Sequence, residues 1–459
     1  MRKRLFVRPS GLAIPAAILG TSVLATTAAG SPESEVRAVP ARAAGWPQFR
    51  GPRRDAVSPE RGLLEAWPPD GPPLLWRARG LGRGYSSPIV AGGRIYVTGD
   101  VGDDLRIFAL DLDGDVLWTS ANGRSWRGSY PGSRSSLAYD EGRLYHMNAH
   151  GRAASFDAAS GREIWAADVL ERFAARNITW GIAECILIDG PRAIITPGGR
   201  KAAMAALDKR TGETLWTSGP VTLDPEETAG GAEFPDADEP VDRASHASAV
   251  LFELGSRRFV AGVSSRHIFC VDAETGAPLW KHPIRTVYQV LAIAPVVLPD
   301  GLFMTAPDSG GGRLYRLRLD GSRLRGEVAW TSTMDTCAGG VIAAGGILFG
   351  SWYREHNGFG AVDPKTGETL YRTGELVRGS AAFADGRFYY LAEDGTVALI
   401  EAGREGFRIA SRFRLTGAKK GEAWAHPVVF DGRLYLRCHE ALECRDVRAP
   451  APPRGEIRW

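Results

Sequence analysis

A nine-residue sequence motif, here called the word, recurs along this chain and constrains its fold more than any other feature. The word is Asp-x-x-(Thr/Ser)-Gly-x-x-(apolar)-Trp, and it stands at residues 157–165, 208–216 and 272–280. A fourth copy at 363–371 ends in Tyr instead of Trp, and degenerate copies end at Trp118, Trp330 and Phe413. Successive copies close 41 to 64 residues apart. This period is typical of the four-stranded blades of a β-propeller.

The chemistry of the word predicts a hairpin turn. An Asp side chain can accept the backbone N–H groups of the turn, and Gly supplies a positive φ that other residues resist. The alternating residues that follow predict a strand. A thin blade cannot bury its closing Trp alone, so we expect this ring to pack against the next blade.

A second repeat precedes the word and consists of two apolar strands around a short Gly turn. Examples are 87–97, 381–390 and 426–436. Each unit therefore predicts four strands, A to D, but the last unit, 424–447, lacks strand D. The segment 73–76 has no unit of its own and can supply that strand, which would close the ring and leave no open sheet edge. The sequence therefore predicts an all-β, eight-bladed propeller of four-stranded antiparallel blades over residues 46–447, in one domain.

The N-terminal end has the pattern of a secretory signal peptide. Four basic residues among the first eight precede a small, apolar, uncharged stretch over 11–29. We expect a signal peptide at 1–30, a flexible leader at 31–45 and a Pro/Arg-rich tail at 448–459. An uncleaved signal anchor is the alternative. The first cysteine is Cys185, so a lipoprotein anchor has no attachment point, and the expected location is periplasmic or extracellular.

Composition excludes several classes of function. A formal net charge of +3 over 459 residues gives no footprint for nucleic acid. No later segment is apolar enough to span a membrane, and no nucleophile elbow, phosphate loop or paired zinc motif occurs. We expect a monomer. The segment 222–242 holds eight acidic residues without hydrophobic periodicity and predicts a mobile loop, with a lid or a weak calcium site as alternatives.

The repeat resembles that of the pyrroloquinoline quinone (PQQ) repeat superfamily. This superfamily of eight-bladed propellers includes quinoprotein alcohol dehydrogenases and the lipoprotein propeller of the outer-membrane barrel-assembly machinery. The segments 46–52 (WPQFRGP), 180–184, 424–427 and 432–436 resemble exported bacterial PQQ-like propellers. The resemblance covers residues 46–447 and implies the fold, whereas the function needs a separate argument from the site.

In this architecture the A strands line a central channel, and the loops from strand D to the next strand A gather at one face. These loops carry charged and aromatic residues that suit a planar anion. The candidate ligand-binding residues are Arg83, Tyr85, Tyr130, Arg134, Trp180, Glu184, His246, Gln289, Asp335, Arg378, Trp424 and His426. The alternative is that they only hydrogen-bond one another and water at the channel mouth.

Two classes of function remain open. The first is a binding or scaffold module that takes a small ligand or a protein partner at the channel mouth. The second is a PQQ- and calcium-dependent oxidoreductase of alcohols or sugars, for which Asn177, Glu184 and Asp335 are the candidate calcium ligands and PQQ and Ca²⁺ the cofactors. No Cys-Cys pair, which many such dehydrogenases carry, occurs in the chain.

The five cysteines give one candidate disulfide. Cys438 and Cys444 flank a turn at 439–443, where antiparallel strands could bring them opposite each other. Cys185 and Cys270 are predicted to pack in the core. An odd count leaves at least one cysteine outside any internal pair.

Overall fold

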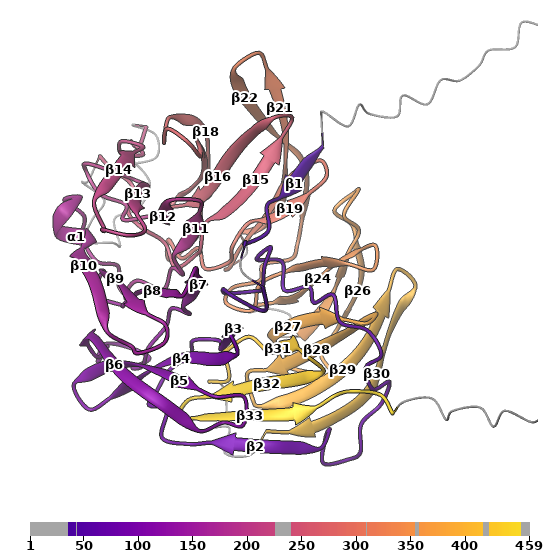
Figure 1. Cartoon of the computed structure of the whole chain (residues 1–459). Helices are drawn as coiled ribbons and strands as arrows, with labels where there is room; N and C mark the ends of the chain where they lie inside the picture. Colours follow the sequence, from indigo (N-terminus) through magenta and orange to yellow (C-terminus); the bar gives the residue numbers. More distant parts are fainter. Residues whose placement is uncertain are drawn as a thin grey trace, which may run out of the picture.

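Eight antiparallel sheets form a closed ring in the computed structural model of this protein (Figure 1). The structure describes residues 35–42, 44–224, 240–308, 310–353, 358–415 and 422–450. Each sheet is one blade, and strand A lies at the inner end and strand D at the rim. The prediction of an eight-bladed β-propeller is confirmed.

The first four blades follow the chain order without a break. Blade 1 has β3 (Ile89–Ala91), β4 (Arg94–Val101), β5 (Asp104–Leu110) and β6 (Val116–Arg124). Blade 2 has β7 (Ala138–Asp140), β8 (Arg143–Met147), β9 (Arg152–Asp157) and β10 (Glu163–Asp168), followed by the short helix α1 (Val169–Arg172). Blade 3 has β11 (Leu187–Asp189), β12 (Arg192–Ile195), β13 (Ala205–Asp208) and β14 (Thr214–Thr217). Blade 4 has β15 (Val250–Leu254), β16 (Arg257–Val263), β17 (His267–Asp272) and β18 (Pro278–Pro283).

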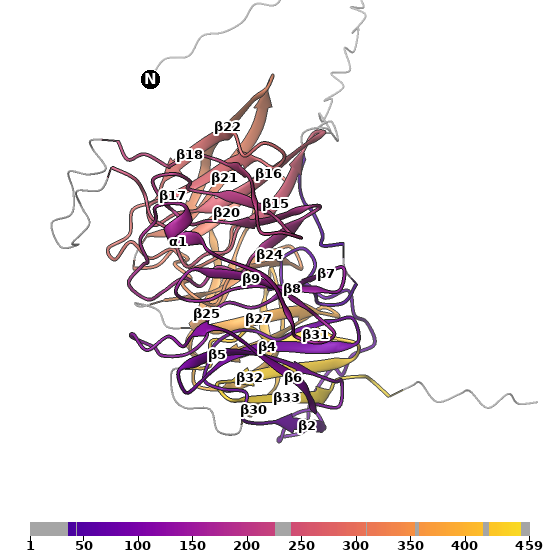
Figure 2. The ribbon, with the colours of Figure 1, turned by 60° about the vertical axis from the view of Figure 1, so that its left-hand side comes forward.

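The remaining blades continue round the ring, and the long β21–β22 hairpin of blade 5 extends past its neighbours (Figure 2). Blade 5 has β19 (Val296–Leu298), β20 (Gly301–Ala306), β21 (Gly311–Asp320) and β22 (Arg323–Ser332). Blade 6 has β23 (Ile342–Ala344), β24 (Ile347–Trp352), β25 (Gly358–Val362) and β26 (Thr369–Thr373). Blade 7 has β27 (Gly379–Ala384), β28 (Arg387–Ala392), β29 (Thr396–Gly403) and β30 (Gly406–Arg414). Blade 8 has β31 (Val428–Phe430), β32 (Arg433–Cys438), β33 (Ala441–Asp446) and, from the N-terminal side, β2 (Leu74–Ala78).

The ring closes through strand β2, as the sequence predicts. Strand β2 pairs antiparallel with β33, and Trp76 lies opposite Cys444. The indole N–H of Trp76 donates to the carbonyl oxygen of Leu112 in blade 1 at 2.8 Å. Blade 8 is therefore built from both ends of the folded chain, which joins the last blade to the first.

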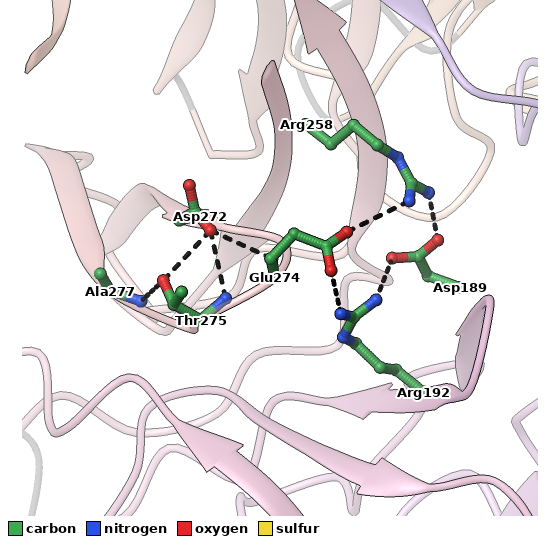
Figure 3. A network of polar contacts seen from close by, with 7 residues as sticks. All are labelled: Asp189, Arg192, Arg258, Asp272, Glu274, Thr275 and Ala277. Atoms are coloured by element: carbon green, nitrogen blue, oxygen red, sulfur yellow. Dashed lines mark hydrogen bonds and ion pairs between the residues drawn. The ribbon is translucent and has the colours of Figure 1, made fainter. Parts of the chain in front are cut away.

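The repeated word forms the turn between strands C and D, shown for blade 4 in Figure 3. The Asp272 carboxylate accepts hydrogen bonds from the backbone N–H groups of Glu274 and Thr275, each at 3.1 Å. Gly276 has a φ of +73°, and a side chain there would collide with Trp216 of blade 3. The closing aromatic ring of one blade thus packs on the turn glycine of the next, which explains why both residues recur.

Ion pairs add a second link between blades 3 and 4 (Figure 3). Arg192 of β12 and Arg258 of β16 both contact Asp189 and Glu274, so two guanidinium groups alternate with two carboxylates. The Asp189 side chain is only 3% exposed, and the two arginines satisfy its oxygens.

The leader predicted to be flexible over 31–45 contains a strand instead. Strand β1 (Val36–Ala38) pairs antiparallel with β15, so that blade 4 has five strands. The Val36 side chain is 2% exposed because it packs among apolar residues of blades 4 and 5. Burial of this side chain fixes a segment that composition alone marks as unstructured.

The predicted disulfide between Cys438 and Cys444 is absent. The β32–β33 hairpin turns at 439–440, so Cys438 lies opposite Ala441 and Cys444 lies opposite Tyr435. The cysteines are therefore three register positions apart, and no disulfide joins them. The expected turn over 439–443 was too long, because strand β33 already begins at Ala441.

Several expectations concern residues outside the described ranges. These are the signal peptide at 1–30, most of the acidic segment 222–242 and the end of the tail. The structure describes only the two ends of the acidic segment. There Thr222 pairs with Val241, and the buried Asp242 carboxylate contacts His267 Nδ1 at 2.8 Å. Within the described ranges, no helix is long and apolar enough to cross a membrane.

Candidate functional site

A cavity of about 390 Å³ occupies the central channel at the face where the D-to-A loops meet. One position in each blade lies on its wall, four residues before the start of strand A in most blades. These eight positions are Tyr85, Arg134, Ala183, His246, Ala292, Ala338, Arg378 and Trp424. The ring is therefore symmetric in backbone but not in side chains, and alanines in blades 3, 5 and 6 leave the room that the cavity fills.

A belt of hydrogen bonds joins five of these loops, two residues further along each of them. The N–H of His426 donates to Ser87 Oγ at 2.8 Å, and the N–H of Ser87 donates to Ser136 Oγ at 2.9 Å. The N–H of Ser136 contacts Cys185 Sγ at 3.2 Å, and that of Cys185 donates to Ser248 Oγ at 3.0 Å. These four contacts join blade 8 to blade 1, blade 1 to blade 2, blade 2 to blade 3 and blade 3 to blade 4, and they fix the loops that carry this part of the wall.

The segment 44–58 crosses the middle of the ring (Figure 1), and its residue Phe49 lines the cavity. Trp46 forms a bridge with Val90 of blade 1, and Val57 forms one with Phe383 of blade 7. Between these anchors, the Phe49 ring lines the cavity and lies edge-on to His426, with ring centres 4.9 Å apart. We call this segment the plug, because it gives the channel a floor.

The plug is held by arginines that are almost fully buried. Arg54 is 4% exposed and donates to the carbonyl oxygens of Cys185, Ile186 and Ala249 at 3.1, 2.6 and 2.9 Å. Its Nε donates to the Gln48 side chain at 3.0 Å. Burial lowers the pKa of the Arg50 guanidinium to about 10. These groups bind backbone carbonyls beside the inner strands, so hydrogen bonds hold the plug to the ring.

Aromatic rings make up much of the cavity wall. The Tyr85 and Trp424 rings lie 4.9 Å apart, and Tyr130 lies 5.1 Å from Trp424. Across the mouth, Trp180 lies 6.0 Å from the His246 ring. Tyr130 is 50% exposed and Tyr288 is 41% exposed, so the rim presents aromatic surface to solvent.

The two wall arginines differ in their partners. Arg378 donates from Nε to Glu393 at 2.8 Å and from Nη1 to the carbonyl oxygen of Tyr353 at 2.8 Å. Arg134 donates from Nη2 to the carbonyl oxygens of Ser129 and Tyr130, each at 2.9 Å, while its buried Nε has no hydrogen-bond acceptor. Burial lowers the pKa of Arg134 to about 10.

The two histidines of the cavity are neutral near pH 7. Burial, with the Arg134 charge nearby, lowers the pKa of His246 to about 4, and both of its ring nitrogens lack partners. Burial and Arg50 lower the pKa of His426 to about 3. His426 Nε2 lies 3.1 Å from the Ala338 carbonyl oxygen, so Nε2 carries the proton and Nδ1 is an acceptor without a donor.

Eight of the twelve candidate residues lie on the cavity wall. They are Tyr85, Tyr130, Arg134, Trp180, His246, Arg378, Trp424 and His426. Arg83 lies off the wall, 3.4 Å from Glu422, and Gln289 lies between the wall residues Tyr288 and Val290. Gln289 follows a turn at 287–288 and has a φ of +53°, a left-handed conformation that separates its side chain from those of its two neighbours.

Glu184 and Asp335 also lie off the cavity wall. The carboxylate of Glu184, which precedes the wall residue Cys185, accepts bonds from the N–H and hydroxyl of Thr196, both at 2.7 Å. Burial raises the pKa of Glu184 to about 7. Asp335 accepts the backbone N–H of Tyr353 at 2.8 Å.

Sequence reasoning missed the residues that the B-to-C turns add to the wall. Asp308, Tyr353 and Glu393 follow strands β20, β24 and β28 and line the cavity. In a four-stranded antiparallel blade, the B-to-C turn emerges on the same face as the D-to-A loop, so strand order alone would have found them. Phe49 of the plug had no comparable signal.

The candidate calcium ligands do not share a common site. The amide nitrogen of Asn177 donates to the carbonyl oxygen of Ala149, and its amide oxygen accepts the N–H of Ile178. Glu184 and Asp335 are engaged as described above. Across the described ranges, no group of three or more His, Cys, Asp or Glu side chains could hold a metal ion.

Comparisons with known proteins identify the same class of fold. A family model described as outer membrane protein assembly factor BamB matches residues 44–183 and 200–351. BamB from Moraxella catarrhalis is 15% identical with a TM-score of 0.56, over 83% of this chain and 98% of that chain. Quinohemoprotein alcohol dehydrogenase from Comamonas testosteroni is 15% identical with a TM-score of 0.54, over 90% and 82%. Among curated proteins a search finds no match.

Proposed function

The chain belongs to the family of outer membrane protein assembly factor BamB, one of the PQQ-repeat propellers, and on this premise we propose that it is an exported binding protein whose ligand enters the channel mouth. The ligand is a small molecule held in the cavity. A side chain or short segment of a protein partner is the other occupant to be tested, because the family description names an assembly factor.

The observation that carries this proposal is a cavity closed at one end inside a rigid ring. Its volume of about 390 Å³ lies in the range of small-molecule sites, and its wall combines aromatic faces with a few polar groups. Alanines at three of the eight wall positions keep the space open, and the belt and the plug hold the remaining wall in place. A ring that served only as structure could fill this space with larger side chains.

The proposed place of action is the periplasm or the extracellular space. The expectation of a signal peptide supports export, and the rim supports contact with another molecule there. Val287 is 57% exposed beside Tyr288, and Tyr130 is exposed on the opposite side of the mouth. Apolar groups on a loop rim are typical of binding surfaces.

The alternative, a PQQ- and calcium-dependent oxidoreductase, has the fold in its favour, but the described residues expected to hold its calcium ion do not form a calcium site. Calcium needs several oxygen ligands around one point, with carboxylates among them. The wall offers the carboxylates of Asp308 and Glu393, and Glu393 is already paired with Arg378. The oxygen donors expected from the sequence are bound elsewhere.

Native mass spectrometry of the exported protein, purified without dialysis, tests the proposal. We expect a bound mass beyond that of the polypeptide, and its loss in Ala292→Phe, which places a ring in the cavity. Ala166→Phe, on the exposed face of β10, is the matched control and should keep the ligand.

Two further measurements separate the alternatives. A photo-crosslinking residue at Tyr130 in whole cells reports a protein partner at the rim. Dye-linked oxidation of alcohols or sugars after addition of PQQ and Ca²⁺ reports the oxidoreductase. A protein without bound mass and without rim crosslinks would contradict the binding proposal.

A further inference from the structure

We propose that the cavity binds a ring-shaped carboxylate, with its carboxylate group between Arg134 and His246 and its ring against the aromatic wall. The inference rests on the proposed function, since it assigns a chemical class to the ligand of that same cavity. Aromatic acids and acidic sugars share this chemistry: each presents a flat ring face and one carboxylate.

The first argument is that polar atoms without partners converge on this part of the wall. Arg134 Nε and both ring nitrogens of His246 are buried and make no hydrogen bond. A buried polar atom without a partner is costly, so each one on a cavity wall is a candidate contact for a bound molecule. Neutral His246 has one donor and one acceptor nitrogen, so it and Arg134 Nε together offer two donors without an acceptor.

The second argument concerns charge. Arg378 has its counterion on the wall, because Glu393 accepts from its Nε at 2.8 Å. Among the described residues Arg134 forms no ion pair, and its guanidinium lies over the Trp126 and Tyr85 rings, 5.3 and 6.0 Å from their centres. The carboxylate that affects its pKa is Asp100, which accepts the backbone N–H of Trp126 and acts on Arg134 without direct contact. Arg134 is therefore the wall cation that needs an anion.

The third argument is the order of the wall positions. Arg134, Ala183 and His246 are the equivalent residues of blades 2, 3 and 4, so the smallest side chain lies between the two groups without partners. Burial and, after it, the Arg134 charge lower the pKa of His246, so the two side chains lie within electrostatic range of each other. A carboxylate above Ala183 can accept from Arg134 and from the N–H of neutral His246.

The fourth argument is the surface beyond this pair. Trp180 lies 6.0 Å from the His246 ring, and Tyr85, Tyr130 and Trp424 form a continuous aromatic face across the cavity. The acceptor site therefore borders flat apolar surface. A ring that stacks there while its carboxylate reaches Arg134 uses both features at once, whereas a free inorganic anion would use only one.

Isothermal titration calorimetry with two matched ligand pairs tests the inference. One pair is benzoate and benzamide, and the other is D-galacturonate and D-galactose. We expect the carboxylate of at least one pair to bind at least about tenfold more tightly than its neutral partner, and the successful pair tells an aromatic acid from an acidic sugar. Arg134→Gln should abolish this preference. Arg127→Gln, in the same loop but exposed, should retain it.

A second readout follows His246 directly. A carboxylate bound beside it should raise the pKa of His246 above its value of about 4, as measured by NMR of the imidazole signals, and His246→Gln identifies the signal. The inference is wrong if neither carboxylate is preferred, or if the preference persists in Arg134→Gln. If the neutral compounds bind as tightly as the carboxylates, the proposed function stands and the carboxylate assignment is overturned. If none of the four compounds binds, the assignment is overturned and the result also counts against a small-molecule cavity.

Discussion

Replacing Arg54 by Met tests whether the plug holds the ring together. Met has a similar length and keeps the apolar contacts of the stem, but it removes the guanidinium. The variant leaves the carbonyl oxygens of Cys185, Ile186 and Ala249 without the donor they have now. It also releases the plug from blades 3 and 4, and the cavity floor lies above that attachment.

The magnitude follows from the contacts that are lost. Three buried acceptors at about 1–3 kcal/mol each give a loss of about 3–9 kcal/mol. Relief from burying a cation with no carboxylate contact offsets several kcal/mol of this, which leaves a net loss of about 3 kcal/mol. For about 400 ordered residues, the entropy of unfolding is about 0.8 kcal/mol per kelvin, so the melting temperature should fall by about 4 °C.

Differential scanning calorimetry of three proteins measures this effect. The wild type, Arg54→Met and Arg53→Met should be compared, because Arg53 is half exposed and pairs with Asp55 at the surface. We expect Arg53→Met to melt within about 1 °C of the wild type, since surface ion pairs contribute little. If Arg54→Met and the wild type have the same melting temperature, the hydrogen bonds of the plug do not stabilise the ring and the reasoning is refuted.

Three further predictions concern the core, the turns and the cysteines. The pKa of Glu184 is about 7 in the folded protein and ordinarily 4.5, so the folded state binds the proton more tightly. The stabilisation that protonated Glu184 gives the folded state is present below pH 4.5 and is lost as pH rises through 7, a loss of about 3 kcal/mol in the free energy of unfolding. Glu184→Gln should lack this loss when its free energies of unfolding at pH 5 and pH 8 are compared. A variant with the pH dependence of the wild type would contradict the prediction. Gly212→Val forces a branched residue to a φ of +75° and towards Trp165, and should cost about 1–3 kcal/mol in denaturant unfolding without changing ligand affinity. The unfolded, unreduced protein should titrate five thiols, whereas a count of three would mean that one pair of cysteines is bonded and would contradict the structure.

The fold was predictable because the residue types of the repeat indicate their own structural roles. Asp272 and Gly276 can be assigned to a turn from their chemistry, and Trp216 can be assigned to a blade interface from its size. Ring closure followed from counting strands, since one unit lacked a strand that another segment could supply. The strand at 36–38 was not predictable, because its only signal is a single Val that packs against a distant blade.

The site was predictable only in part, because the side toward which each side chain points depends on its position along the loop. The loops were identified correctly as channel-facing, yet Glu184 and Gln289 each sit one residue from a wall position and point elsewhere. A shift of one residue reverses the side that a side chain faces where the backbone is extended, and a turn followed by a left-handed φ, as at Gln289, changes the direction again. Tyr353 and Glu393 were missed because only one of the two loop sets on that face was considered.

Belt positions and the wall positions two residues before them have different partners, although both sets of side chains line the cavity. The belt residues Ser87, Ser136 and Ser248 bond the backbone of a neighbouring blade, so a substitution there changes the loops that carry the wall. The wall residues Ala183 and His246, two positions earlier, face the cavity, and the His246 side chain makes no hydrogen bond to the belt. A substitution at these wall positions can therefore alter the shape and charge of the cavity while the bonds that join blades 8, 1, 2, 3 and 4 remain, which is how a symmetric backbone comes to hold an asymmetric site.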